Sequence, residues 1–148
     1  IINVEMWDAS RPMPRTILPP PMGKPLVPDL PNWSWHEYGM RVGFWRFHEL
    51  YKKLGIKPTL SINARVCEDY PRVAQACLDA GWEFMGHSFE QGPIHKEENQ
   101  QAMIERSLDT LEKFTPVAGR NIGDTYGFIR LSAPLCLALA TGAFEDNP

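Results

Sequence analysis

The chain has 148 residues, of which 43% are hydrophobic and 22% are charged, and its formal net charge is -3. This composition is typical of one soluble globular domain and excludes an intrinsically disordered chain. The positive charges form no cluster that would bind a phosphate backbone, so we expect no nucleic-acid partner. The apolar runs are short and no secretory signal is evident, so we expect a cytoplasmic protein without a membrane partner.

Apolar and polar residues alternate in three short stretches, which predicts three β-strands over residues 1–6, 59–64 and 82–87. Residues 7–32 contain eight prolines and must form an extended loop, which is either a functional cover or a solvated spacer. Within each strand the polar residues share one side. The pairs are Asn3 with Glu5, Ser61 with Asn63, and Glu83 with His87.

A helix is predicted after each strand. The aromatic-rich residues 32–39 lead into the first helix, which begins at Met40 and ends at Gly55. The second helix begins at residues 69–71 and ends at Gly81, and the third covers residues 97–114. One apolar stripe is expected along the first helix. Its members are Met40, Phe44, Phe47, Tyr51 and Leu54.

The alternation of strands and helices predicts an α/β fold with parallel pairing. Both faces of an open, doubly wound sheet would be apolar, whereas a shared polar side is typical of the inside of a barrel. Three βα units cannot close a barrel. We therefore expect a partial (β/α) barrel completed by dimerisation into a homodimer or higher homo-oligomer, the alternative being a truncated fragment.

Residues 116–148 follow a different pattern. Residues 126–131 predict a strand, and residues 135–140 predict a short apolar helix that must be buried. We expect this segment to cover the gap in the barrel or to swap between copies. The three cysteines, Cys67, Cys77 and Cys136, lack the spacing of a disulfide framework or a zinc site, and we expect them to be small buried hydrophobic residues.

Several motifs occur in an order that resembles a known family. They are Asn3-Val4-Glu5, residues 32–43, residues 67–73, residues 81–87 and the glutamine-rich start of the third helix. Together they resemble the N-terminal part of a polysaccharide deacetylase, or NodB-homology, domain, in the branch that includes allantoinase-like hydrolases. The resemblance covers residues 1–115, so we interpret residues 1–148 as a single truncated domain with a divergent segment from residue 116.

The resemblance implies an irregular (β/α) barrel that hydrolyses acetamido or related C–N bonds on a divalent metal held by an aspartate and two histidines. Glu5 matches the acidic position of the general base, and His87 matches the first metal histidine. Met6 and Gln91 stand at the other two ligand positions, and a thioether is a poor ligand for such a cation. His95 would substitute if its loop folded back. We expect either zinc or another divalent metal on Glu5, His87 and His95, or no metal.

The predicted function is a hydrolase of amide, acetamido or ester bonds in a small-molecule substrate. Glu5 or His87 would act as the general base, with His95 as a third candidate catalytic residue. We expect Asn63 and Gln91 to bind the developing oxyanion. Two further residues, Trp35 and Tyr38, would form an apolar wall of the substrate site.

Two other functions are consistent with the same residues. Met6 and Gln91 favour a non-catalytic oligomeric remnant of a deacetylase domain. Alternatively, an isomerase or lyase would use Glu5 and His87 alone as acid and base. His36 is interpreted as a surface or capping residue.

Overall fold

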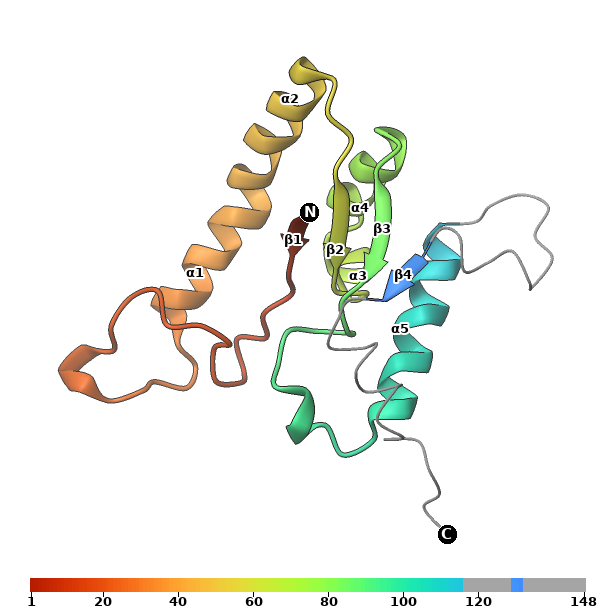
Figure 1. Cartoon of the computed structure of the whole chain (residues 1–148). Coiled ribbons are helices and arrows are strands. Elements are labelled where there is room, and N and C mark those ends of the chain that lie inside the picture. Colours follow the sequence, from red (N-terminus) through yellow and green to blue (C-terminus); the bar gives the residue numbers. More distant parts are fainter. Residues whose placement is uncertain (116–128, 132–148) are drawn as a thin grey trace, which may run out of the picture.

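The computed structural model of this chain describes residues 1–115 and 129–131. The strands among these residues form one parallel sheet in the order β1-β2-β3-β4. They are β1 (Ile2–Val4), β2 (Thr59–Ile62), β3 (Glu83–Gly86) and β4 (Ile129–Leu131) (Figure 1). The predicted parallel α/β architecture is confirmed. β4 occupies the end of the predicted strand 126–131, and the predicted helix 135–140 lies outside the described residues.

Helices connect the strands, as predicted. Residues 30–54 form one continuous helix, made of α1 (Leu30–Tyr38), a wider π-type turn (Gly39–Gly43) and α2 (Phe44–Leu54). α3 (Val66–Asp69) and α4 (Pro71–Asp79) connect β2 to β3, and α5 (Gln100–Phe114) follows β3. Short 3-10 turns occur at Pro21–Gly23 and Ile94–Lys96. Figure 1 shows the long helix beside β1, α3 and α4 behind β2 and β3, and α5 next to β4.

The first helix begins at Leu30 rather than at Met40, so the predicted start was wrong. The carboxylate of Asp29 accepts a hydrogen bond from the Asn32 main-chain N–H at 3.2 Å and caps the first turn, where Pro31 is tolerated. The predicted stripe is only half buried. Phe47 is 57% exposed because it lies along the open side of β1, which is the edge strand of the described sheet.

The predicted strands, and the predicted start of the third helix, extend beyond the observed elements. The polypeptide leaves the sheet before Met6 and Ala64, although the main-chain bond from Asn63 N to the Val4 oxygen, at 3.2 Å, continues the ladder by one residue. The second helix is preceded by the separate turn α3, since Pro71 disfavours helical backbone at the residue before it. The third helix begins at Gln100 because the Asn99 side chain caps it.

The register confirms that the strands have one apolar and one polar face. On the polar face Thr59 pairs with Glu83, and the next row is Asn3, Ser61 and the apolar Met85, whereas the alternate rows are wholly apolar. The apolar rows pack against the helices, and this core includes Val4, Leu60, Ile62, Phe84, Phe44, Val73, Cys77 and Leu111. The polar face is therefore turned away from the helices, as it is inside a (β/α) barrel.

The proline-rich loop is fastened to the first helix by Asn32, whose side chain is almost fully buried. Its Oδ1 accepts hydrogen bonds from the main-chain N–H groups of Ile17 and Leu18 at 2.7 and 2.8 Å, and its Nδ2 donates to the Leu18 oxygen at 3.0 Å. These contacts favour a cover over a solvated spacer for this loop.

Two of the three cysteines can be placed. Cys67 and Cys77 are buried, as expected, and burial raises the pKa of each thiol to about 12, so both stay protonated. Cys136 lies outside the described residues. In residues 1–115 and 129–131, no helix is long and apolar enough to cross a membrane.

Candidate active site

Three side chains predicted to be functional follow β1, β2 and β3 on the polar face. Glu5, Asn63 and His87 each stand two residues beyond the row formed by Asn3, Ser61 and Met85. Because the strands are parallel, these three residues follow the carboxyl ends of neighbouring strands. This edge is where (β/α) barrels place their active sites.

The Glu5 carboxylate is held by two partners and its side chain is only 10% exposed. Arg15 Nη2 donates to Oε1 at 3.1 Å, and the indole Nε1–H of Trp7 donates to Oε2 at 3.0 Å. Arg15 belongs to the proline-rich loop, so the loop covers this carboxylate. Both oxygens are engaged, which fixes the orientation of the carboxylate.

His87 is half-buried and lies in the electrostatic environment of Glu5 and Arg15. Burial lowers the pKa of its imidazole below the ordinary value, the Glu5 carboxylate raises it, and the Arg15 guanidinium lowers it. Its Nδ1 is buried and has no hydrogen-bond partner among the described residues. The imidazole is therefore neutral at pH 7 and able to accept a proton.

Asn63 joins the ends of the strands on both sides of it. Its Oδ1 accepts a hydrogen bond from the Met6 main-chain N–H at 2.8 Å, and its Nδ2 donates to the main-chain oxygen of His87. The side chain is fully buried. Since these bonds use the carbonyl and one N–H, a contact with an oxyanion would have to use the second N–H.

His36 is a buried neighbour of the site and not a surface residue, so its interpretation was wrong. It is only 6% exposed, its Nε2 bonds to the Glu5 main-chain oxygen at 2.8 Å, and its ring stacks on Trp7 at 5.4 Å. Burial lowers the pKa of this histidine. With the helix starting at Leu30, buried residues recur every four positions at Asn32, His36 and Met40, and this period is the signal that would have placed it.

A cleft of about 470 Å³ runs along β1 and is lined in part by Glu5, Arg15, Trp35 and Tyr38. The structure therefore brings the two predicted wall residues to the same cleft as Glu5. Both aromatic side chains are 51% exposed, so they are accessible to a ligand.

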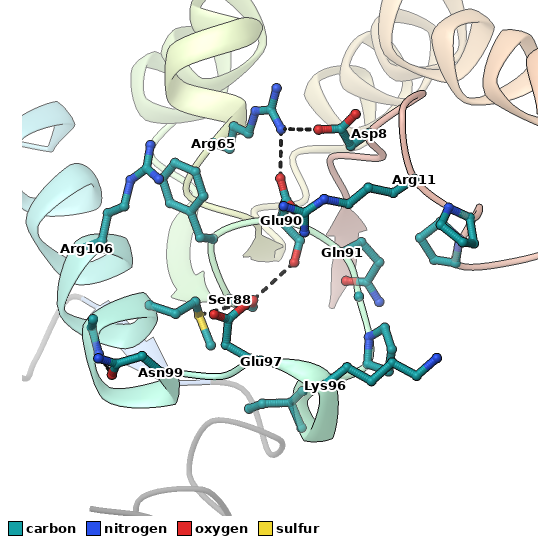
Figure 2. A pocket seen from close by; sticks show the side chains of 18 of the residues that line it. Asp8, Arg11, Arg65, Ser88, Glu90, Gln91, Lys96, Glu97, Asn99 and Arg106 are labelled. Atoms are coloured by element: carbon teal, nitrogen blue, oxygen red, sulfur yellow. Dashed lines mark hydrogen bonds and ion pairs between the residues drawn. The ribbon is translucent and has the colours of Figure 1, made fainter. Parts of the chain in front are cut away.

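A larger cleft, of about 800 Å³, lies among the loops after β1, β2 and β3 and the start of α5 (Figure 2). Gln91 lines this cleft, and its main-chain N–H donates to the Met6 oxygen at 2.9 Å. His95 is exposed on the turn Ile94–Lys96 and lines neither cleft. His87 also lines neither cleft, and its relation to Glu5 is the electrostatic interaction described above, whereas no described contact brings His95 to either residue.

An ion-pair network that the sequence did not predict joins the same loops. Arg65, which follows β2, pairs with Asp8 at 3.0 Å, with Glu90 at 2.7 Å and with Asp69 at 3.0 Å. Figure 2 shows Asp8 and Glu90 pointing towards Arg65 from two different loops. Hydrogen bonds from Ser10 and Arg65 lower the pKa of Asp8 to about 2, so the network stays charged at neutral pH.

The donors present do not fit the implied metal site. In the described part of the chain, no three His, Cys, Asp or Glu side chains are grouped as ligands of one ion. Met6, at the position of the metal aspartate, is 7% exposed and packs in the hydrophobic core. Both oxygens of Glu5 already have protein donors.

Comparison with known proteins identifies similar structures. No protein-family model matches the chain, and no curated protein matches it. The crystal structure of PuuE allantoinase is similar, with a TM-score of 0.57 and 26% identity over 71% of this chain. A probable polysaccharide deacetylase from Pseudomonas aeruginosa PAO1 is similar, with a TM-score of 0.56 and 24% identity over 71% of this chain.

The chain spans 38% of the length of each of these two proteins. This chain therefore has the fold of part of a deacetylase barrel of the NodB-homology superfamily, as the order of its sequence motifs implied.

Proposed function

We propose that this chain is a hydrolase of C–N bonds, in amide or acetamido substrates, or of ester bonds, with His87 as the general base and Glu5 as the group that tunes it. The observation that carries the proposal is the placement of these two residues beyond the carboxyl ends of parallel strands, in a fold similar to allantoinase and deacetylase structures.

The reaction needs few groups. A water molecule attacks the carbonyl carbon while the neutral imidazole of His87 takes its proton, and the resulting imidazolium gives that proton to the departing nitrogen as the C–N bond breaks. His87 is favoured as the base over Glu5 because the Glu5 oxygens bind Arg15 and Trp7, whereas no hydrogen bond from the described residues engages Nε2 of His87, the ring nitrogen that is not buried. The Glu5 carboxylate stabilises the imidazolium that forms.

The first test compares His87→Gln with the unaltered chain on allantoin, N-acetylglucosamine oligomers and p-nitrophenyl acetate. Loss of a general base is expected to lower kcat/KM by at least ~100-fold. The matched control is His48→Gln, since His48 Nδ1 is also buried without a hydrogen bond, but its nearest charged group is Glu49 at 4.0 Å and its Nε2 bonds the Ala76 oxygen at 3.2 Å. Equal rates in both variants would contradict the proposal.

The second test uses the pH profile. Protonation inactivates the base, so the rate should rise with pH, with a midpoint below 6.5 because burial lowers the pKa of His87. Glu5→Gln removes a charge that raises this pKa and should move the midpoint to lower pH. Arg15→Gln removes a charge that lowers it and should move the midpoint to higher pH. Unchanged midpoints in both variants would exclude His87 as the titrating base.

A non-catalytic role is the second candidate, because a core methionine occupies the position of a metal ligand. A folded chain that hydrolyses none of the three substrates faster than His87→Gln would favour this role.

A further inference from the structure

We infer that the large cleft among the strand-end loops binds the carboxylate group of a small organic acid, with Arg106 of α5 as its anion-binding residue. The inference does not depend on the proposed hydrolysis, because it concerns binding at a different group of side chains.

Arg106 is held in place by an aromatic ring. Its Cζ lies 3.6 Å from the centroid of the Phe89 ring, and Phe89 is itself 6% exposed and part of the hydrophobic core. A guanidinium stacked on a fixed ring directs its N–H donors sideways, in the plane that a carboxylate needs for two parallel hydrogen bonds.

The guanidinium N–H groups of Arg106 make no close ion pair with the described residues. Among the described residues its ion-pair partner is Glu68, at 3.8 Å, which is longer than a hydrogen bond. The two side chains are 62% and 48% exposed. An arginine that lies over a buried ring, is accessible and has no described partner within hydrogen-bond distance can bind a ligand without first breaking a strong protein contact.

The other arginines of the cleft are already neutralised. Arg65 has three carboxylate partners within 3.0 Å, and Arg11 pairs with Glu90 at 2.5 Å. Figure 2 shows dashed contacts from Arg65 to Asp8 and to Glu90. Arg65 therefore stabilises the loops, and Arg106 is the arginine left to bind a ligand.

The charge of the cleft favours a singly charged ligand over a phosphate dianion. Carboxylates outnumber cations among the described residues that line it, so each further negative charge on a ligand is opposed. The carboxylates are Asp8, Glu68, Asp69, Glu90 and Glu97, and the cations are Arg11, Arg65, Lys96 and Arg106.

Binding can be measured by titrating the 15N-labelled chain with N-acetylglycine and following amide chemical shifts. N-acetylglycinamide, which has the same shape without the charge, is the matched ligand control, and inorganic phosphate is the competing anion. We expect saturable shifts around α5 with N-acetylglycine and weaker binding of the other two. Equal binding of the neutral amide, or tighter binding of phosphate, would overturn the carboxylate assignment.

Variants then test the residue. Arg106→Gln should weaken N-acetylglycine binding about tenfold or more, because it removes charge-assisted hydrogen bonds. Glu68→Gln should strengthen it severalfold, since a competing carboxylate is lost. Arg72→Gln is the control, because Arg72 also lies over a ring, that of Trp45 at 5.9 Å, but outside the cleft. Unchanged affinity in Arg106→Gln would refute the inference.

The same titration with His87→Gln distinguishes binding from hydrolysis, because this variant should bind N-acetylglycine with unchanged affinity even if it hydrolyses no substrate.

Discussion

The buried amide of Asn63 bonds the main chains that follow β1 and β3, so one side chain holds three strand ends in register. The candidate base lies at one of these ends and Glu5 at another. The geometry of the site therefore depends on a residue that need not touch a substrate.

Replacement of Asn63 by alanine should lower the free energy of unfolding by about 2–3 kcal/mol, because the buried N–H of Met6 and the partly buried main-chain oxygen of His87 lose their partner. Urea denaturation measures the change. Asn3→Ala is the control. Asn3 lies on the same face of the sheet and pairs with Ser61, but it is exposed. If Asn63→Ala lowers the free energy of unfolding no more than Asn3→Ala does, water must replace the hydrogen bonds of the amide.

At the same scale, the sequence predicted Glu5 and His87 but not the partners that define their state. Arg15 is ten positions from Glu5 across a proline-rich loop, and His36 lies on a helix that the sequence pattern started too late. Contacts across a loop carry no periodic signal, so only the folded chain reveals them.

Among the elements, the helix over residues 30–54 is the one that differs most from the prediction. Its first turns carry few apolar residues at helical spacing, whereas the cap at Asp29 and the buried Asn32 depend on the loop that packs against them. Its end was predicted correctly, because Gly55 has the positive φ of 66° that a left-handed cap requires.

Two glycines of this helix should respond in opposite ways to alanine. Gly55→Ala places a side chain at positive φ and should destabilise the chain by about 1 kcal/mol. Gly39→Ala, where φ is -55° and an added Cβ meets nothing within 4 Å, should stabilise it by about 0.5–1 kcal/mol. Thermal unfolding followed by circular dichroism compares them. Destabilisation by Gly39→Ala would mean that the π-type turn requires glycine.

For the whole molecule, the open side of β1 is the feature with the largest consequence. β1 is the edge of the described sheet, and the exposed aromatic residues Trp35, Tyr38 and Phe47 line the cleft beside it. Exposed apolar surface next to an unpaired strand edge favours association. The predicted homodimer remains a prediction, and this surface is where we expect it to form.

Sedimentation equilibrium should give a mass of twice the 16.9 kDa of one chain. Phe47→Glu should raise the dissociation constant by at least tenfold, because it places a charge in the apolar interface. Leu50→Glu is the control, since Leu50 is also exposed on α2 but does not line the cleft. A monomer at all concentrations, or equal effects of the two variants, would contradict the predicted interface.

The sequence by itself determined the parallel α/β class, the order of strands and helices, the polar face of the sheet and the position of Glu5 and His87, because alternation, caps and motifs are local properties of the chain. Only the tertiary structure decided that Asn63 joins three strands, that Arg15 covers Glu5 and that Arg106 stacks on Phe89. These contacts join residues from different elements, and their geometry follows from the packing of the whole sheet and its helices.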